Sequence, residues 1–140
     1  MTCYEVPAGM GASRKLIRRL EENESALLLK MQQLLTSWLE RYPKARFVDL
    51  VLQRQGFSKL LWRSRFKASG SQRFVDLFSS DLLHTLPSDV VAFAAEFEQP
   101  RILLNAEMKS VRSLRLAVES YLSSMRQLRN WQASEKILPL

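Results

Sequence analysis

Side chains with catalytic potential are few in this sequence. The chain has one histidine, His84. Asp76, Asp81 and His84 are spaced so that they would converge on one side of a short helix, where carboxylates and an imidazole can bind a metal or transfer protons. His84 lies in an apolar segment, however, where a capping or core role fits its surroundings better.

Other reactive groups also lack supporting residues. Tyr4, Tyr42 and Tyr121 would suggest a nucleophile that nicks DNA, but that chemistry needs a metal or several histidines. Residues 69–71, SGS, have neither the spacing nor the lysine of a phosphate-binding loop. The single cysteine, Cys3, excludes an intrachain disulfide and a cysteine metal cage, and it fits a reducing cytoplasm. We predict a cytoplasmic protein that is not an enzyme and has no metal or cofactor.

Positive charge is concentrated in one stretch of the chain. The formal net charge is +7, and residues 44–75 contain eight Lys or Arg and one acid. Residues 76–100 contain five acids and no base. A clustered positive surface is typical of proteins that bind nucleic acid, and DNA is favoured over RNA. The alternative is that these cations solubilise an exposed strand and protect its edge from aggregation.

The basic stretch has the alternation of a β-strand. From residue 59 to residue 67, Leu60, Trp62 and Phe66 would face one side, while the other side carries four cations. Residues 47–54 predict a partner strand, and residues 55–57 predict the turn between them. The inner face of this partner strand would contain Val48, Leu50 and Leu52.

Such a two-stranded ribbon can enter the major groove of DNA. Six residues are the predicted nucleic-acid contacts: Arg54, Lys59, Arg63, Arg65, Lys67 and Arg73. Arg63 and Arg65 would lie closest to the bases, and the others would neutralise phosphates. Trp62 is expected in the core, whereas Phe57, at the turn, would be an exposed aromatic.

Helices are expected on both sides of the ribbon. Residues 1–12 predict a flexible leader, Ser13 a helix cap, and the following apolar stripe a long helix that ends before Pro43. The basic run at residues 14–19 opposes the dipole of this helix, which is mild evidence for a role other than stability. Residues 72–86 predict a short helix with an apolar face that includes Phe74.

A second long helical region is expected after a break and cap at residues 86–89. Pro100 predicts either a bend or two consecutive helices, because proline removes a backbone donor and clashes with the preceding turn. The last helix would run from about Arg101 to Gln132 and bury one stripe that ends with Leu128 and Trp131.

These elements predict an α+β fold with a long N-terminal helix, a central two-stranded antiparallel hairpin, and C-terminal helices with a break or kink near Pro100. Residues 13–133 would form a single globular domain, and residues 134–140 a tail. No stretch approaches 18 uninterrupted apolar residues, so no membrane contact is expected.

Two segments carry a family resemblance: LLWRSR at residues 60–65 and FEQPRILLNAEM at residues 97–108. They resemble a family of small uncharacterised proteins carried by bacterial integrative and conjugative elements. In that family a strand ending in Leu-x-Trp-Arg precedes a helical Glu-x-x-Arg-Ile-x-Leu-Asn segment. The resemblance covers about residues 47–125, and Pro100 departs from the pattern. It implies a mobile-element context, in which DNA transfer, DNA processing or its regulation are the expected roles.

Two functional hypotheses follow. The first is a non-catalytic nucleic-acid-binding accessory protein of a mobile element, which uses the basic ribbon. The second is a helical protein–protein adaptor or inhibitor that does not bind DNA. In that case the amphipathic helices would hold a second copy of the chain or another protein of the element, and the acidic residues 76–100 could dock on a basic surface.

Overall fold

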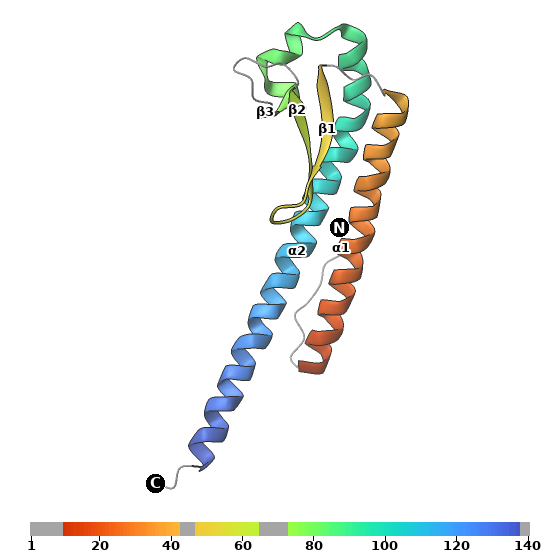
Figure 1. Ribbon diagram of the computed structural model, residues 1–140. Coiled ribbons are helices and arrows are strands. Elements are labelled where there is room, and N and C mark those ends of the chain that lie inside the picture. Colours follow the sequence, from red (N-terminus) through yellow and green to blue (C-terminus); the bar gives the residue numbers. More distant parts are fainter. Residues whose placement is uncertain (1–9, 43–46, 65–72, 138–140) are drawn as a thin grey trace. The chain divides into compact units, whose positions relative to one another are not determined.

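The computed structural model describes residues 10–42, 47–64 and 73–137. Its elements, in chain order, are α1 (Met10–Arg41), β1 (Val48–Gln53), β2 (Lys59–Ser64), β3 (Arg73–Val75), the 3-10 helices η1 (Leu77–Ser79) and η2 (Asp81–Thr85), and α2 (Ser88–Ile137) (Figure 1). This confirms the α+β class and the long N-terminal helix. The chain divides into unit 1, with described residues 10–24 and 110–137, and unit 2, residues 25–109.

The sheet of unit 2 has three antiparallel strands in the order β1-β2-β3. The β1–β2 hairpin was predicted, and its turn contains Gly56 at φ +69°. This left-handed conformation is strained for residues with a Cβ, so glycine suits the position. Along β2, Leu60, Trp62 and Ser64 are buried, which confirms the predicted alternation.

The third strand was not predicted. Residues 73–75 pair with β2, with Val75 opposite Trp62 and Phe74 opposite Arg63. The predicted helix over residues 72–86 is therefore wrong, and η1 and η2 follow the strand. The backbone of β2 has hydrogen-bonding groups along both of its edges. Pairing with β3 provides partners for the groups on the edge that faces away from β1. This long-range pairing outweighs the local apolar periodicity that suggested a helix.

Helix α1 has the expected apolar stripe but begins earlier than expected. Leu27, Met31 and Trp38 are buried along it in unit 2. Ser13 lies within the helix and is fully buried, so the predicted cap at Ser13 is wrong. Its small side chain allows close packing at this point of the helix.

Helix α2 is continuous through Pro100, and the predicted division into two helices is wrong. The helix begins at Ser88, as the Pro-Ser-Asp sequence indicated, and extends to Ile137, into the predicted tail. Contacts to the sheet from Glu98 and Arg101, on either side of Pro100, hold the helix in place. Tertiary packing thus outweighs the poor helix propensity of proline.

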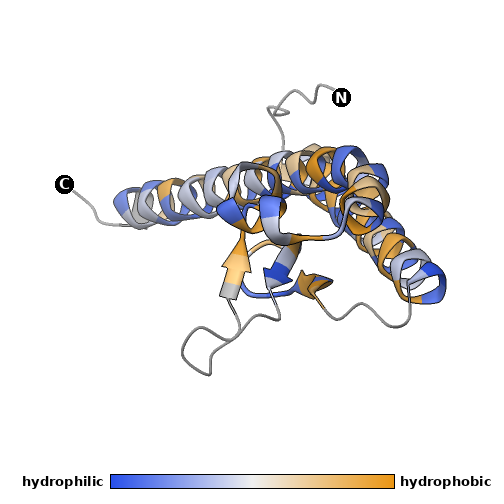
Figure 2. Cartoon of the chain, turned by 90° about the horizontal axis from the view of Figure 1, so that it is seen from above, coloured by the Kyte–Doolittle hydropathy of each residue, from blue (hydrophilic) through white to orange (hydrophobic). Residues whose placement is uncertain are grey.

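The core of unit 2 is an aromatic cluster around Trp38. The strands form a layer on one side of the helical segments (Figure 2). Trp38 and Trp62 are both buried, with ring centroids 5.1 Å apart in an edge-to-face arrangement. Phe93 stacks on Trp38 at 5.0 Å, and Phe97 meets it edge-on at 5.3 Å. Such pairs add about 0.5–1.5 kcal/mol each beyond area burial, so this cluster fixes both helices to the sheet.

Unit 1 has a smaller core. Leu16 and Leu20 of α1 pack with Val118 of α2, and all three are at most 5% exposed. Ile17, Val111 and Leu114 are partly buried around them. This confirms the expected pairing of the two long helices through their apolar stripes.

Candidate interaction surfaces

The register between β1 and β2 determines which side chain lies opposite Arg63, the central cation of the predicted basic face. Arg63 lies directly opposite Asp49 on the outer face of the hairpin. Its Nη2 is 3.5 Å from Asp49 Oδ2, and the two side chains are 33% and 9% exposed. The cation is therefore partly neutralised. The Nε of Arg63 is buried and has no hydrogen-bond partner among the described residues.

The other predicted contacts near the turn are more accessible. Arg54 is exposed immediately after β1. Lys59 is half-buried, and its Nζ lies 5.4 Å from the ring of Phe57, a cation–π contact. Phe57 is half-buried rather than fully exposed. Lys59 and Arg63 share the outer face of β2, as predicted.

Three predicted contacts are only partly covered by the structure. Arg65 and Lys67 lie outside the described residues. Arg73 is the first residue of β3 and pairs with Ser64 through the backbone, but its side chain is not described. A role for these residues in binding nucleic acid stays a prediction.

The outer face of the sheet is more apolar than the sequence suggested. Phe74, expected in a helix core, is 51% exposed opposite Arg63. Val51 and Leu61 are half-buried on the same face. The structure thus places apolar side chains between the cations, and the hairpin has a third strand beside it. Both features differ from the two-stranded cationic ribbon that was predicted.

The residues that carried the family resemblance meet in one hydrogen-bonded network. Asn105 Oδ1 accepts from the Leu60 N–H at 2.7 Å, and Asn105 Nδ2 donates to the Leu60 carbonyl at 2.8 Å. Arg101 Nη1 donates to the same carbonyl at 3.1 Å and forms an ion pair with Glu98. Glu98 in turn accepts from Trp62 Nε1 at 2.6 Å. These residues join α2 to β2, and none of them points to a reaction.

The Asn105 side chain completes the sheet where β3 is too short. Val75 pairs with Trp62, so the position opposite Leu60 would belong to residue 77, which instead lies in η1. Asn105 supplies one donor and one acceptor there, as a strand residue would. The motif residues therefore have a clear structural role.

Unit 1 contains one strong ion-pair cluster. Arg115 Nε lies 2.5 Å from Glu24 Oε2, and Arg115 Nη1 lies 2.8 Å from Glu119 Oε1. The hydrogen bonds to Glu24 raise the pKa of the Arg115 guanidinium, and Glu119 acts in the same direction. Arg115 therefore joins α1 to α2.

The candidate catalytic residues do not form a site. Asp76, Asp81 and His84 are all exposed, so His84 has no core role. Across the part of the chain that the structure describes, no group of three His, Cys, Asp or Glu could hold a metal ion. Among the described helices, none has the length and apolar character needed to cross a membrane.

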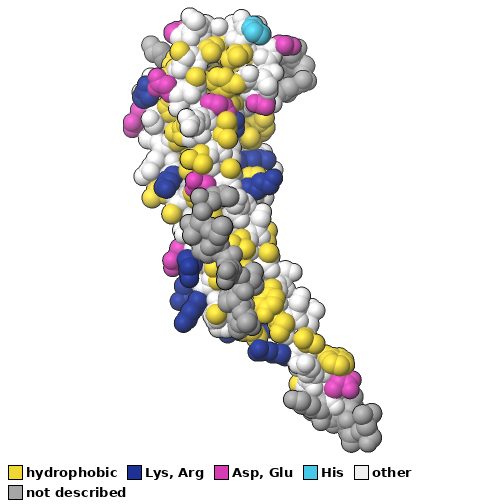
Figure 3. Space-filling view, turned by 180° about the vertical axis from the view of Figure 1, so that it is seen from behind, with side chains coloured by type: hydrophobic (Ala, Val, Ile, Leu, Met, Phe, Trp, Pro, Cys, Tyr) yellow, Lys and Arg dark blue, Asp and Glu magenta, His cyan; other side chains and the backbone are white. Residues whose placement is uncertain are grey.

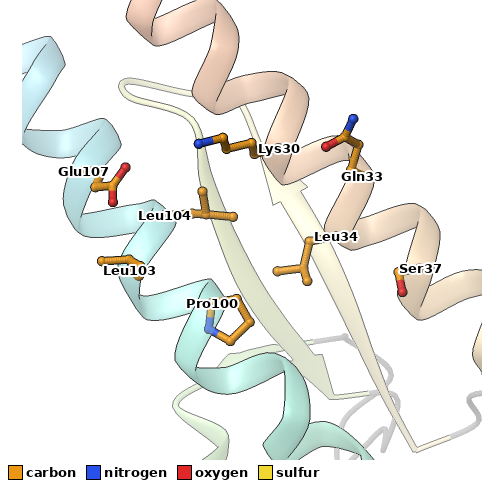
Figure 4. Close-up of a pocket in the computed structure, with 8 residues that line it drawn as sticks. All are labelled: Lys30, Gln33, Leu34, Ser37, Pro100, Leu103, Leu104 and Glu107. Atoms are coloured by element: carbon orange, nitrogen blue, oxygen red, sulfur yellow. The ribbon is translucent and has the colours of Figure 1, made fainter.

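Two hollows in unit 2 are lined largely by aliphatic groups. One, of about 410 Å³, opens between α1 and α2, and Leu34, Leu104 and Pro100 point into it (Figure 4). The other, of about 570 Å³, lies on the outer side of α2 beside Phe78, where Ile102 and Leu103 are more than half exposed. Both offer contacts to apolar side chains rather than groups for catalysis.

The end of α2 exposes two large apolar residues that were expected in the core. Leu128 is 45% exposed and Trp131 is 60% exposed. Around the helix, Leu128 is turned by about 80° and Trp131 by about 140° from Val118. Both therefore lie off the buried stripe of Val118 and Leu122. Figure 3 shows hydrophobic side chains on the surface of this lower part of the chain, with Lys and Arg beside them. The spacing of the predicted stripe contained the missed signal, because steps of mostly three residues drift around a helix that has 3.6 residues per turn.

Comparisons with known proteins add no relative to these observations. No family model, no curated protein and no solved structure matches the chain.

Proposed function

We propose that this protein is a non-catalytic adaptor that binds a partner protein through the apolar end of α2. The observation that carries the proposal is the exposure of two large apolar side chains one turn apart on α2, Leu128 and Trp131, on a side of the helix turned away from the stripe that packs against α1. Arg129 Nη1 contacts Met10 Sδ, at the first described residue of α1.

An exposed helical end of this kind is costly without a partner. Residues 123–135 include no buried side chain, and a helix of about 12–15 residues is marginal in water unless its apolar face packs on something. Tryptophan is also the residue type most enriched among those that dominate binding energy. A groove that accepts an amphipathic helix would bury Leu128 and Trp131 together.

Charge indicates what kind of partner would fit. Arg126 and Arg129 are exposed on the same end of α2 as Leu128 and Trp131. A second copy would bring the same cations to the interface, whereas an apolar groove with an acidic rim would complement them. The resemblance to mobile-element proteins supports a partner encoded by the same kind of element, met in the cytoplasm.

The test is quantitative binding of a purified partner. Candidates captured from cells by the full chain would be purified and titrated against the wild type and a variant with Leu128→Ser and Trp131→Ser. We expect at least about 30-fold weaker binding, because anchors of this type contribute 2 kcal/mol or more. Leu116→Ser is the matched control, since Leu116 is 47% exposed on the same helix. Equal affinity of the double variant and the wild type for every purified candidate would refute the proposal.

Nucleic-acid binding is the second candidate, and exposed cations favour it. Arg14, Lys15 and Arg18 are exposed near the start of α1, whose first turn contains no acidic residue. They oppose the helix dipole and repel one another, so a bound polyanion would relieve both costs. The basic stretch with Arg54 and Lys59 provides a second group of cations.

An electrophoretic shift assay with duplex and single-stranded DNA at several salt concentrations tests this candidate. Four phosphate contacts would give a log–log salt slope of about −3 to −4. Replacing Arg65 and Lys67 by Gln would flatten the slope by about 2 if the ribbon binds, and replacing Arg14 and Arg18 would do so if α1 binds. Absence of any shift at low salt would reject nucleic-acid binding.

A further inference from the structure

Helix α2 has one exposed face that contains no charged residue. From Gln99 to Trp131, steps of three and four residues pass only through positions that are exposed and uncharged. The steps average about 3.6 residues, so these positions stay on one side of a helix. Because α2 is continuous over this range, they form one line of accessible side chains about nine turns long, the α2 seam.

The α2 seam has large side chains at its two ends and small ones between them. Leu103 is 56% exposed near one end, and Leu128 and Trp131 are 45% and 60% exposed at the other. The seam positions between Leu103 and Leu128 are Ala106, Ser110, Ser113, Ala117, Ser120 and Ser124. Small side chains allow two helices to approach closely. The middle of the seam therefore fits a second helix whose facing residues are also small.

The α2 seam matches itself when a second α2 lies antiparallel to it. With the middle of the seam as the centre, Leu103 lies opposite Leu128 of the second copy, and Ser113 lies opposite its Ala117. The other opposed small residues are Ala106 with Ser124 and Ser110 with Ser120. Large side chains thus meet large ones and small side chains meet small ones. A two-fold axis between the helices produces both halves of this contact from one pattern.

A hollow at one end of the α2 seam has room for the tryptophan of the other end. Gln99, Leu103 and Ala106 line this hollow of about 570 Å³, and Phe78 lines it from beside the helix. In the antiparallel arrangement, Trp131 of the second copy lies opposite Gln99 and therefore at the hollow. Its indole would be removed from water there and would meet the aromatic ring of Phe78. The hollow thus selects the same arrangement as the small residues do, by a separate observation.

Charge does not oppose a second copy in this arrangement. The seam contains no Lys, Arg, Asp or Glu, so the formal charge of +7 is not brought into the contact. The ends of the two α2 helices lie at opposite ends of an antiparallel contact. Arg126 of one copy therefore does not meet Arg126 of the other, and the repulsion between like cations at the end of α2 is avoided.

We propose that two copies of this protein associate through the α2 seam, with their α2 helices antiparallel and related by a two-fold axis. The proposal rests on the adaptor function, because Leu128 and Trp131 provide one end of the contact, and it names a second copy as the partner of that site. An amphipathic helix of a different protein is the alternative occupant that the test must separate.

Analytical ultracentrifugation of the full chain measures the association. We expect a reversible dimer with a dissociation constant below about 10 μM. Ser124→Lys should weaken it by at least about 30-fold, because a long cationic side chain would stand between the helices opposite Ala106 of the second copy. Ser123→Lys is the matched control, since Ser123 is exposed but turned by about 100° from Ser124. Circular dichroism verifies that both variants are folded.

Disulfide cross-linking tests the direction of the helices. Cys3→Ser removes the only cysteine, and Ser110→Cys and Ser120→Cys are then introduced separately. Oxidation of a mixture should join one variant to the other, because a disulfide needs Cα atoms within about 7 Å. Neither variant should cross-link with itself, since two copies of position 110 would be about 15 Å apart along an antiparallel pair.

Three results would overturn the proposal. They are a chain that stays monomeric at about 100 μM, equal weakening by Ser124→Lys and Ser123→Lys, and self-cross-linking of Ser110→Cys in preference to the mixed product. A monomeric chain that binds a different protein through Leu128 and Trp131 would refute the second copy but keep the adaptor function. A dimer that Ser124→Lys dissociates, in a chain whose Leu128 and Trp131 variant binds every other partner normally, would support the seam, so the two proposals fail separately.

Discussion

At the scale of single residues, two glycines with the same surroundings should respond in opposite ways to the same substitution. A Cβ added at Gly56 or at Gly11 would meet no atom within 4 Å. Gly56 has φ +69°, whereas Gly11 lies in α1. We expect Gly56→Ala to lower the free energy of unfolding by about 1 kcal/mol, because alanine is strained at positive φ. Gly11→Ala should raise it by about 0.5–1 kcal/mol.

Urea denaturation of the two alanine variants measures both effects. The comparison is sharp because steric contacts are excluded at both sites, so only the backbone preference differs. A stabilising Gly56→Ala would show that the turn is not held in the left-handed conformation.

Asn105 should contribute far more to the free energy of unfolding than Asn130, which also lies in α2. Replacing it with leucine removes both hydrogen bonds to the Leu60 backbone and leaves those groups partly buried without that partner. Leaving buried polar groups unsatisfied costs about 1–3 kcal/mol each. We expect Asn105→Leu to reduce the free energy of unfolding by about 2–4 kcal/mol. The exposed Asn130→Leu control should change it by less than about 0.5 kcal/mol, and equal effects in the two variants would contradict the role of Asn105.

At the scale of elements, the continuity of α2 makes Pro100 a site for stabilisation. Proline has no N–H to donate to the carbonyl of Glu96, and its ring crowds the preceding turn. We expect Pro100→Ala to raise the free energy of unfolding by about 1–3 kcal/mol, with the helical circular dichroism signal kept. Destabilisation would indicate that the proline is matched to a bent helix, as the sequence alone suggested.

The ion pair between the two helices of unit 1 should also be measurable. Arg115 is 16% exposed and Glu24 is 17% exposed, so water screens their interaction only partly. We expect Arg115→Met to destabilise the protein by about 1–3 kcal/mol, and the exposed Arg126→Met to have little effect. Coupling with Glu24→Gln in a double-mutant cycle would confirm a direct interaction.

The direction of the Arg115 pKa predicts how this contribution varies with pH. Because folding raises the pKa of Arg115, its contribution is complete below the ordinary arginine range and is lost only at still higher pH. The Arg115 guanidinium should therefore add no slope to stability between about pH 6 and pH 9. Denaturation of the wild type and Arg115→Met over this range measures the difference.

Local periodicity correctly predicted the elements whose pattern is set by residues close to one another in the sequence. The stripe of α1 and the alternation in β2 are confirmed because one buried face dictates each pattern. β3 was missed because Phe74 and Val75 suit a strand only when β2 is beside them. The division into two helices at Pro100 was predicted wrongly for the same reason, since the contacts of Glu98 and Arg101 with the sheet lie 36–41 residues away in sequence. The alternative, a bend within one helix, stays a prediction.

The candidate site was predicted less well than the fold. Sequence alternation placed Lys59 and Arg63 on one face correctly, but it could not show that Arg63 faces Asp49. The pairing of Arg63 with Asp49 depends on the register between two strands. The residue pattern of a single strand does not determine that register. Similarly, spacings of three and four residues suggested one stripe from Val118, which α1 covers, to Trp131, which is exposed. The two residues are about 140° apart around the helix, so they face different sides.

At the scale of the whole molecule, the charge of +7 permits both candidate functions, and the placement of the cations separates them. Arg63, which was expected on the open face of the ribbon, forms an ion pair within the fold, and so does Arg115 of α2. The cations that remain accessible include Arg54 and the first turns of α1. A polyanion would therefore meet two described groups of cations, the predicted one at Arg54 and Lys59 and a further one at the start of α1.

The exposed end of α2 gives a prediction that tests the adaptor function without knowledge of the partner. Residues 123–135 include no buried side chain, whereas Val90, Ala94 and Phe97 are buried in the first turns of the same helix. Opening free energies follow local burial, so amides of residues 123–135 should exchange with deuterium at least about 100-fold faster than those of residues 90–97. A bound partner should slow exchange around Leu128 and Trp131 selectively. Equal protection of the two segments in the free, monomeric chain would mean that the stripe is already covered, and that it is not available to a partner.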